Sequence, residues 1–516
     1  MIEIFLGVVV GVLTVISLIL KYQDGKRYSQ IPAAPCRLPF IGNAVTMDMS
    51  RAHLVLTELA ERLGPIFRVR IFQEEIVVLN DYDTITEALV TNGSDFAGRP
   101  PMSRTEEAGR SSHSIVWQTY TPKLVFLRKE VHKCLKMYGS GFEKLEEKCA
   151  PEIAHLLEVI TETEGQPFDP RDSVYDAVSC IMLSLILGTS NKLSVQCRRK
   201  LQEINFLFNT TFGSGSARWM DLIPLAKVFR FGEHRILQKA LKLRDDFWNK
   251  DILLQAADQG VVRRMLFFAE NKDEYEFDIS ENTAKEVFTN LIFAGTDTTA
   301  TSLTCLLLLL LHHPDVQTKL HAELMEVVGP TRLPRLSDKE NMPYTQATLW
   351  ELLRIIGHVP LAVPHYTLSD TSIQGKLVPA NTTVYINLWA LLHDHTFWES
   401  PWDFRPERFL DSNNRLLPPS HPVRRRMLAF GAGRRVCLGE AMAKNRLFLF
   451  VTALIQNFVF EPVEGELLPD ADPRTFDMGL VLHPRKFKLC AKSRRSRPLY
   501  TQAVRQQPHL NGQSAC

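Results

Sequence analysis

Paired cysteines, a strong excess of charge of either sign, and internal repeats are all missing from this 516-residue sequence. Its nine cysteines are scattered, and none belongs to a Cys-x-x-Cys pair, which argues against a disulfide framework and a zinc site. A reducing compartment therefore fits best. The 60 basic and 58 acidic side chains nearly balance, so the net charge of +2 gives no support to a role in binding nucleic acid.

No segment between residues 46 and 492 is rich enough in proline, glycine or serine to divide the chain. The composition, 45% hydrophobic and 23% charged, is that of a globular protein. Apolar periodicity predicts helices over 125–165, 172–210, 234–270, 281–313, 314–328 and 343–356, and strand-like runs cover 69–79 and 384–388. We therefore expect one large, mainly α-helical domain with a smaller β-rich region at residues 46–492.

The two ends of the chain differ from this body. Residues 4–20 are an apolar run followed by Lys21, Lys26 and Arg27, which predicts a single-pass membrane anchor over residues 1–21 with the body on the cytosolic side. A cleaved signal peptide is the alternative. Residues 22–45 are basic and carry three prolines, which predicts a stiff hinge. Residues 493–516 are polar and basic, which predicts a disordered tail.

The segment from residue 280 to 313 combines an apolar character with a polar interruption. Six leucines in a row at 306–311 predict a buried helix, since the run is too short to cross a bilayer. Within it, Asp297 and Thr298 are unusual choices for a buried helix. The Thr298 hydroxyl can donate a hydrogen bond to the Ala294 carbonyl one turn earlier. Gly295 has no side chain, so a flat group could lie against the helix backbone there. A polar stripe facing solvent is the alternative interpretation.

The cysteine at position 437 lies in the most informative segment, Phe430-Gly431-Ala432-Gly433-Arg434-Arg435-Val436-Cys437-Leu438-Gly439-Glu440. Glycines permit a tight turn, and a helix predicted from residue 440 would favour a thiolate at Cys437. A thiolate is the form that binds iron. Arg435 is placed to meet an anion such as a heme propionate. The alternative is a free cysteine in a glycine-rich turn.

Glu351 and Arg354 lie three residues apart on one face of a predicted helix. Taken alone, such a pair is most simply a surface ion pair. A buried version would need a further partner, and Arg408 is the candidate.

Together these segments resemble the cytochrome P-450 superfamily, from the predicted anchor to about Cys490. The family's heme loop is matched by Phe430, Gly433, Arg435, Cys437 and Gly439, and its oxygen-activating helix is matched by Ala294, Gly295, Asp297 and Thr298. Its buried Glu-x-x-Arg pair is matched by Glu351 and Arg354, with Arg408 as the third partner, and its proline hinge by Pro32, Pro35 and Pro39. The resemblance implies a cytochrome P-450 fold and a buried Glu351–Arg354 pair.

The resemblance also implies the cofactor and its ligands. Heme b would be held by Cys437 as axial thiolate, with Asp297 and Thr298 relaying protons to bound oxygen. The remaining heme-binding residues would be Arg99, Arg128, His365, Arg435, Phe430 and Gly433. One position departs from the family pattern, because Leu124 stands where the family usually has a tryptophan that contacts a propionate.

A monooxygenase acting on a lipophilic substrate is the activity that the resemblance implies. Residues 387–391 and 430–433 look most like the steroid 17α-hydroxylase/17,20-lyase group, with oxidation of planar aromatic xenobiotics as the alternative. A heme-thiolate peroxide isomerase that needs no reductase and a heme sensor or carrier are further alternatives. The expected pocket walls are Ile115, Phe206, Phe288, Phe293, Ala294, Val359, Val363 and Met478.

No flavin or nicotinamide motif is visible, so electrons must come from a partner. The resemblance implies an NADPH-cytochrome reductase, with cytochrome b5 as a second partner, at the endoplasmic reticulum membrane. Positive charge for docking an acidic partner could come from Lys129, Lys133, Arg424, Arg425, Arg426 and Lys444.

Overall fold

The computed structural model describes residues 27–38, 41–72, 74–135, 141–188, 194–213, 221, 232–256 and 259–494. The predicted anchor at 1–21, the first residues of the hinge, Pro39, and all of the predicted tail beyond Arg494 lie outside the described residues. The part that is described confirms the expected architecture, one large mainly helical domain with small β-sheets.

Most of the described chain is helical. The α-helices are α2 (Ala52–Leu63), α3 (Tyr82–Thr86), α4 (Ser103–Glu107), α5 (Arg110–His113), α6 (Pro122–Leu135), α7 (Gly141–Thr161), α8 (Arg171–Leu187), α9 (Val195–Gly213), α12 (Gly232–Phe247), α13 (Val261–Glu270), α14 (Glu281–His312), α15 (Pro314–Val327), α16 (Pro343–Ile356), α17 (Leu388–Leu392), α18 (Pro422–Arg425) and α19 (Glu440–Asn457).

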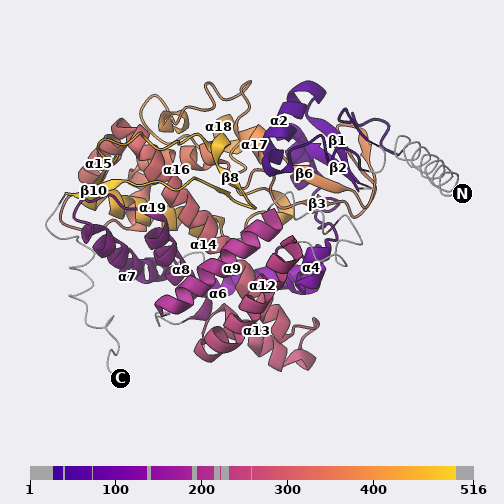
Figure 1. Ribbon diagram of the computed structural model, residues 1–516, viewed down its shortest axis with the longest axis horizontal. Helices are drawn as coiled ribbons and strands as arrows, with labels where there is room; N and C mark the ends of the chain where they lie inside the picture. Colours follow the sequence, from indigo (N-terminus) through magenta and orange to yellow (C-terminus); the bar gives the residue numbers. More distant parts are fainter. Residues whose placement is uncertain are drawn as a thin grey trace, which may run out of the picture.

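The β-rich parts are spread over the molecule, with the four-stranded sheet at one end and the strand β10 (Cys490–Ser493) near the opposite end (Figure 1). The largest sheet has four strands in the order β1-β2-β6-β3, in which β1 (Ile66–Ile71) pairs antiparallel with β2 (Glu74–Leu79) and β2 pairs parallel with β6 (Thr383–Ile386). The last strand of this sheet, β3 (His365–Tyr366), pairs antiparallel with β6. Three two-stranded sheets are built from β4 (Thr371–Ile373) with β5 (Lys376–Val378), β7 (Phe458–Glu461) with β10 (Cys490–Ser493), and β8 (Asp477–Met478) with β9 (Leu482–His483).

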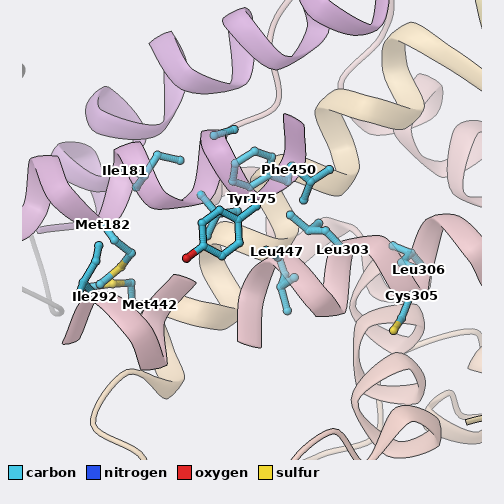
Figure 2. Packing of buried hydrophobic residues seen from close by; sticks show 14 of the residues in the cluster. Tyr175, Ile181, Met182, Ile292, Leu303, Cys305, Leu306, Met442, Leu447 and Phe450 are labelled. Atoms are coloured by element: carbon cyan, nitrogen blue, oxygen red, sulfur yellow. The ribbon is translucent and has the colours of Figure 1, made fainter. Parts of the chain in front are cut away.

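Helix α14 runs through the middle of the molecule and contacts α8, α13, α16 and α19 (Figure 1). In the described part of the chain it is the single helix long and apolar enough to cross a membrane, yet 83% of its most apolar window is buried inside the protein. The prediction of a buried helix is therefore confirmed. Figure 2 shows why it is buried: Ile292 and Leu303 of α14 pack among side chains of α8, such as Met182, and of α19, such as Phe450.

The structure divides several elements that the sequence periodicity joined. The segment 125–165 contains two helices, α6 and α7, and the segment 172–210 contains α8 and α9. Helix α8 ends at Gly188, whose φ of 73° is easily adopted by glycine. The strand-like run 69–79 is a hairpin, since Phe72 has a φ of 55° and reverses the chain between β1 and β2. In each case the apolar pattern of the sequence continues through the turn, because the two elements that the turn joins are both buried.

Candidate functional site

One cavity of about 340 Å³ brings together eight of the nine residues that the sequence analysis assigned to the site. They are Arg99, Arg128, Asp297, Thr298, His365, Phe430, Arg435 and Cys437. The ninth, Gly433, lies in the loop beneath the cavity. These residues come from five separate segments of the chain, so the fold places them together.

The loop that carries Cys437 is closed by backbone hydrogen bonds and left-handed glycines. Gly431 and Gly433 have φ values of 72° and 65°, and the Cys437 amide donates to the Phe430 carbonyl at 2.9 Å. A Cβ at Gly433 would collide with the Leu89 carbonyl, so this glycine also permits a close approach of the loop to another part of the chain. The Cys437 side chain faces the cavity three residues before α19 begins.

Burial raises the pKa of the Cys437 thiol, although the Gly439 amide donates a hydrogen bond to the sulfur and acts in the opposite direction. The thiolate that the sequence suggested at Cys437 therefore stays a prediction, and the Gly439 amide is the contact that favours it. A metal cation deprotonates a coordinating thiol outright, so the charge of a bound iron is what would hold this sulfur as a thiolate.

Three arginines, Arg99, Arg128 and Arg435, form a group that we call the basic triad. Each donates to backbone carbonyls: Arg99 Nε to Val116 at 3.0 Å, Arg435 Nη2 to Gln118 at 2.6 Å, and Arg128 Nη2 to Val436 at 2.6 Å. Within the described residues, none of the three forms an ion pair with a carboxylate.

The basic triad is under electrostatic strain. Burial and the other two arginines hold the pKa of Arg99 well below its usual value, and burial together with Arg128 lowers the pKa of Arg435 to about 9. Nε and Nη1 of Arg435 are buried and have no hydrogen-bond partner in the described part of the structure. Buried cations without anions are costly. The two propionates of a heme would supply the missing carboxylates, so these residues fit that cofactor.

His365 completes this side of the cavity from β3. Its Nδ1 donates to the Phe96 carbonyl at 2.7 Å, and burial and Arg99 hold the pKa of the imidazole well below its usual range. Leu124, which replaces the tryptophan typical of the family, is fully buried in the core of the protein. No indole donor reaches the cavity from that position.

Asp297 and Thr298 face the cavity from α14, on the wall formed by Ala294. The Thr298 hydroxyl donates to the Ala294 carbonyl at 2.7 Å, which confirms the predicted bond. Gly295 also lines the cavity, and the approach of a flat group to its backbone stays a prediction. A Cβ there would lie 2.5 Å from the end of the flexible Met182 side chain of α8.

Asp297 has a partner that the sequence did not reveal. His483 of β9 places Nε2 at 3.3 Å from Asp297 Oδ2, and its Nδ1 lies 3.3 Å from the Thr301 hydroxyl. Burial lowers the pKa of His483, but the carboxylate of Asp297 outweighs it, so the pKa is raised overall. The two residues are 186 positions apart, and no sequence pattern connects them.

The predicted apolar walls are partly correct. The five that line the cavity are Ile115, Phe293, Ala294, Val359 and Val363. Phe206 is 68% exposed, Phe288 is buried against Trp248, and Met478 lines a separate cavity of about 80 Å³. Helix α9 instead turns Asn205, Phe208, Asn209 and Phe212 toward the main cavity, a spacing of three and four residues that could have been recognised.

Glu351, Arg354 and Arg408 form a buried cluster remote from the cavity lining. Arg354 Nε lies 2.7 Å from Glu351 Oε2, and Arg408 Nε lies 3.1 Å from Glu351 Oε1. Arg354 also donates to the Leu392 carbonyl at 3.0 Å. Both Glu351 and Arg354 are fully buried, so the implied buried pair is confirmed and the surface interpretation is wrong.

The cations expected to dock a partner differ in their surroundings. Lys133, Arg426 and Lys444 are paired with Glu130, Asp394 and Glu440. Arg424 lies over the Trp350 ring, and Lys129 and Arg425 are exposed.

Comparison with known proteins gives a consistent result. The family model described as Cytochrome P450 matches residues 32–491. A steroid 17-alpha-hydroxylase/17,20 lyase of Ictalurus punctatus is 32% identical over 470 residues, covering 89% of this chain and 90% of that protein. Cytochrome P450 2E1 of Mesocricetus auratus is 32% identical over 501 residues, covering 94% and 98%. Cytochrome P450 2U1 of Mus musculus is 33% identical over 479 residues, covering 88% and 86%.

Proposed function

Because this chain belongs to the cytochrome P450 family and is a monooxygenase, we propose that it inserts one oxygen atom from O2 into a steroid or a similar lipid. Heme b is the proposed cofactor, with Cys437 as the thiolate ligand of its iron. The observation that carries this proposal is a single cavity that exposes the Cys437 sulfur, the basic triad and the Asp297–Thr298 pair.

In this mechanism the protein supplies the ligand, the proton path and a dry pocket. Heme, when bound, supplies the iron at which O2 is bound and its O–O bond is cleaved. Arg99, Arg128 and Arg435 would bind the two carboxylates of the cofactor, whose negative charges would neutralise this strained group of cations. Asp297 and Thr298 act as a positioned acid–base pair that moves protons through Thr298 Oγ1. Apolar walls keep water away from the reacting C–H bond.

The cavity has a polar end that suits an oxygen-bearing lipid. Asn290 lines it, and the Ser114 hydroxyl donates to Asn290 Oδ1 at 2.5 Å. Asn290 lies eight residues before Thr298 on α14, which corresponds to about 12 Å along the helix axis. A four-ring steroid with an oxygen at one end and the oxidised carbon at the other spans such a distance. The names of the relatives also favour a steroid.

We propose that electrons come from an NADPH-cytochrome reductase, with cytochrome b5 as a second partner, at the endoplasmic reticulum membrane. The catalytic domain would face the cytosol. Asn92, Asn209 and Asn381 each begin an Asn-x-Ser/Thr sequence. On this proposal none of them carries a glycan when the full chain is expressed in mammalian cells, and a shift on glycosidase treatment would contradict the topology.

The experiment that tests the proposal is spectroscopic. The heme-loaded protein should give the carbon-monoxide spectrum of a thiolate-ligated heme, and Cys437→Ala should abolish it. Steroids should then displace the iron-bound water and shift the heme absorbance, whereas planar aromatics should not. Survival of the thiolate spectrum in Cys437→Ala would contradict the ligand assignment. Turnover of lipid hydroperoxides without NADPH would favour a peroxide isomerase instead.

A further inference from the structure

Arg110 is a second buried cation at the cavity, separate from the basic triad. It begins α5, is 4% exposed, and lines the cavity that contains Cys437. Its guanidinium lies over the rings of Phe208 and Phe212, with its central carbon 4.2 and 4.6 Å from the ring centroids. The two ring centroids lie 5.9 Å apart, so the rings do not enclose the guanidinium from opposite faces, and its N–H groups can still meet an oxyanion.

These N–H groups are not satisfied by the protein. Nη2 of Arg110 is buried and has no hydrogen-bond partner among the described residues. Nε lies 3.3 Å from Glu286 Oε2, close enough for an ion pair but not aligned as a hydrogen bond. A buried donor without an acceptor costs free energy, and a charged donor costs more.

The carboxylate beside Arg110 is shared with another arginine. Glu286 Oε1 also accepts from Arg244 Nη1, and Arg244 donates as well to the Ala108 carbonyl at 3.1 Å. Arg244 and Lys285 both pair with Asp245, which is nearly half exposed. The cluster therefore holds three cations and two carboxylates, and an excess positive charge remains at its buried end. Burial and Arg244 lower the pKa of Arg110 to about 10, against the pull of Glu286.

We propose that Arg110 binds an anionic group of the substrate, such as a sulfate or a carboxylate, at the end of the cavity far from Cys437. The proposal rests on the proposed function and narrows its substrate to a lipid with a negative charge at one end. An anion there would accept from Nη2 and neutralise the excess charge, as planar guanidinium groups do in general for oxyanions.

The position of Arg110 also sets the length of that substrate. Its partner Glu286 and the cavity residue Asn290 lie on α14 twelve and eight residues before Thr298, or about 18 and 12 Å along the helix. The reacting carbon must lie near Thr298. An elongated molecule with its anion at the opposite end therefore meets both requirements, whereas a compact anion does not.

The test compares matched pairs of probes with the heme-loaded full-length protein. Spectral titrations that follow water displacement from the heme would give dissociation constants for pregnenolone 3-sulfate against pregnenolone, and for laurate against 1-dodecanol. We expect one of the anions to bind at least about tenfold more tightly than its neutral counterpart. Arg110→Gln should bring that ratio close to one, and Arg110→Lys should retain part of it. Arg263→Gln removes an exposed arginine that pairs with Glu270, and it should leave the ratio unchanged.

The outcomes separate this inference from the function on which it rests. The role of Arg110 would be overturned if neither anion binds more tightly than its neutral counterpart. It would also be overturned if Arg110→Gln weakens the binding of the anion and of its neutral counterpart equally. Either result would leave the monooxygenase proposal intact. A laurate preference that depends on Arg110, with no response to either steroid, would support the anion site and contradict the steroid assignment. If Arg110→Gln does not retain heme, Arg110→Lys decides, and an anion preference equal to that of the unmodified protein would overturn the role of Arg110.

Discussion

Two of the arginine groups inside the described part of the molecule differ in whether the chain itself satisfies them. Arg354 and Arg408 meet Glu351 at 2.7 and 3.1 Å and also reach backbone carbonyls. The basic triad, Arg99, Arg128 and Arg435, meets backbone carbonyls but no carboxylate in the described residues. Burial alone therefore does not separate a structural arginine from one that binds a ligand.

The difference lies in the balance of charge. Where a carboxylate neutralises the cations of a cluster, the cluster needs no ligand, and removing that carboxylate should destabilise the fold. A cluster of like charges lowers the stability of the protein that contains it until an anion arrives, and its loss should damage binding. The basic triad and Arg110 belong to the second kind, since Arg435 and Arg110 retain buried N–H groups without acceptors among the described residues.

The largest effect is expected from Glu351→Ala, which breaks the satisfied group. Two buried guanidinium groups would lose their carboxylate, at a cost of about 3–5 kcal/mol in the free energy of unfolding. Little heme-loaded protein should be recovered. Glu399→Ala removes an exposed carboxylate that pairs with Arg405 and serves as the control, with a loss below about 1 kcal/mol. Urea unfolding measures both, and equal stability of the two variants would contradict a structural role for Glu351.

Arg435→Gln tests the unsatisfied group. Removing one of three like charges should leave the melting temperature of the heme-free protein unchanged or slightly higher. Heme affinity should fall by about 1.5–3 kcal/mol, because a charge-assisted hydrogen bond to a propionate is lost. The rate of heme transfer to an excess of apomyoglobin measures this loss. Arg434→Gln changes the neighbouring, exposed arginine and should transfer heme at the original rate. A heme-free protein clearly destabilised by Arg435→Gln would place Arg435 in the structural class.

A similar contrast exists for hydroxyls along α14. Thr298 donates to the Ala294 carbonyl at the cavity, and Thr304 donates to the Ala300 carbonyl inside the core. Thr298→Ala should keep heme but divert severalfold more oxygen into hydrogen peroxide, since proton delivery is lost. Thr304→Ala should leave coupling intact. The ratio of peroxide to product per NADPH measures the difference, and normal coupling in Thr298→Ala would remove Thr298 from the relay.

The smallest effect is expected from His483→Gln, which breaks the Asp297–His483 pair. The pKa of His483 is raised in the folded protein, so its contribution to stability is complete below the unfolded value of about 6.5 and is lost as pH rises through the raised value. The side chain is 33% exposed, so the contribution is about 1 kcal/mol or less. The difference in melting temperature from the unmodified protein should be visible at pH 6 and absent at pH 9. A difference that persists at pH 9 would contradict the ionic pair.

Residues close together in the sequence were the ones that sequence reasoning placed well. The Cys437 loop and the Thr298–Ala294 bond depend on local spacing, and the structure has both. Burial of Glu351 followed from the family resemblance, because the spacing alone favoured a surface pair. The contacts that were missed, Asp297 with His483 and Glu286 with Arg110 and Arg244, join segments 42 to 186 residues apart. No local pattern encodes such contacts.

A second kind of error came from helix faces. Phe206 was assigned to the cavity by its apolar character, yet the face of α9 defined by Asn205, Phe208, Asn209 and Phe212 is the one turned inward. Two of those four residues are polar, so a rule that sends apolar residues inward selected the wrong face. The polar residues are the ones that give the cavity its chemical asymmetry.

Arg446 of α19 links the two walls of the heme cavity. It is 1% exposed and donates from Nη2 to the Gly295 carbonyl at 2.8 Å and to the Thr299 hydroxyl at 2.9 Å. Helix α19 follows directly from the Cys437 loop, and Gly295 belongs to the turn of α14 that carries Thr298. One guanidinium thus sets the spacing between the proposed sulfur ligand and the proposed oxygen-binding face, and any repacking of α19 would change the width available to a porphyrin ring.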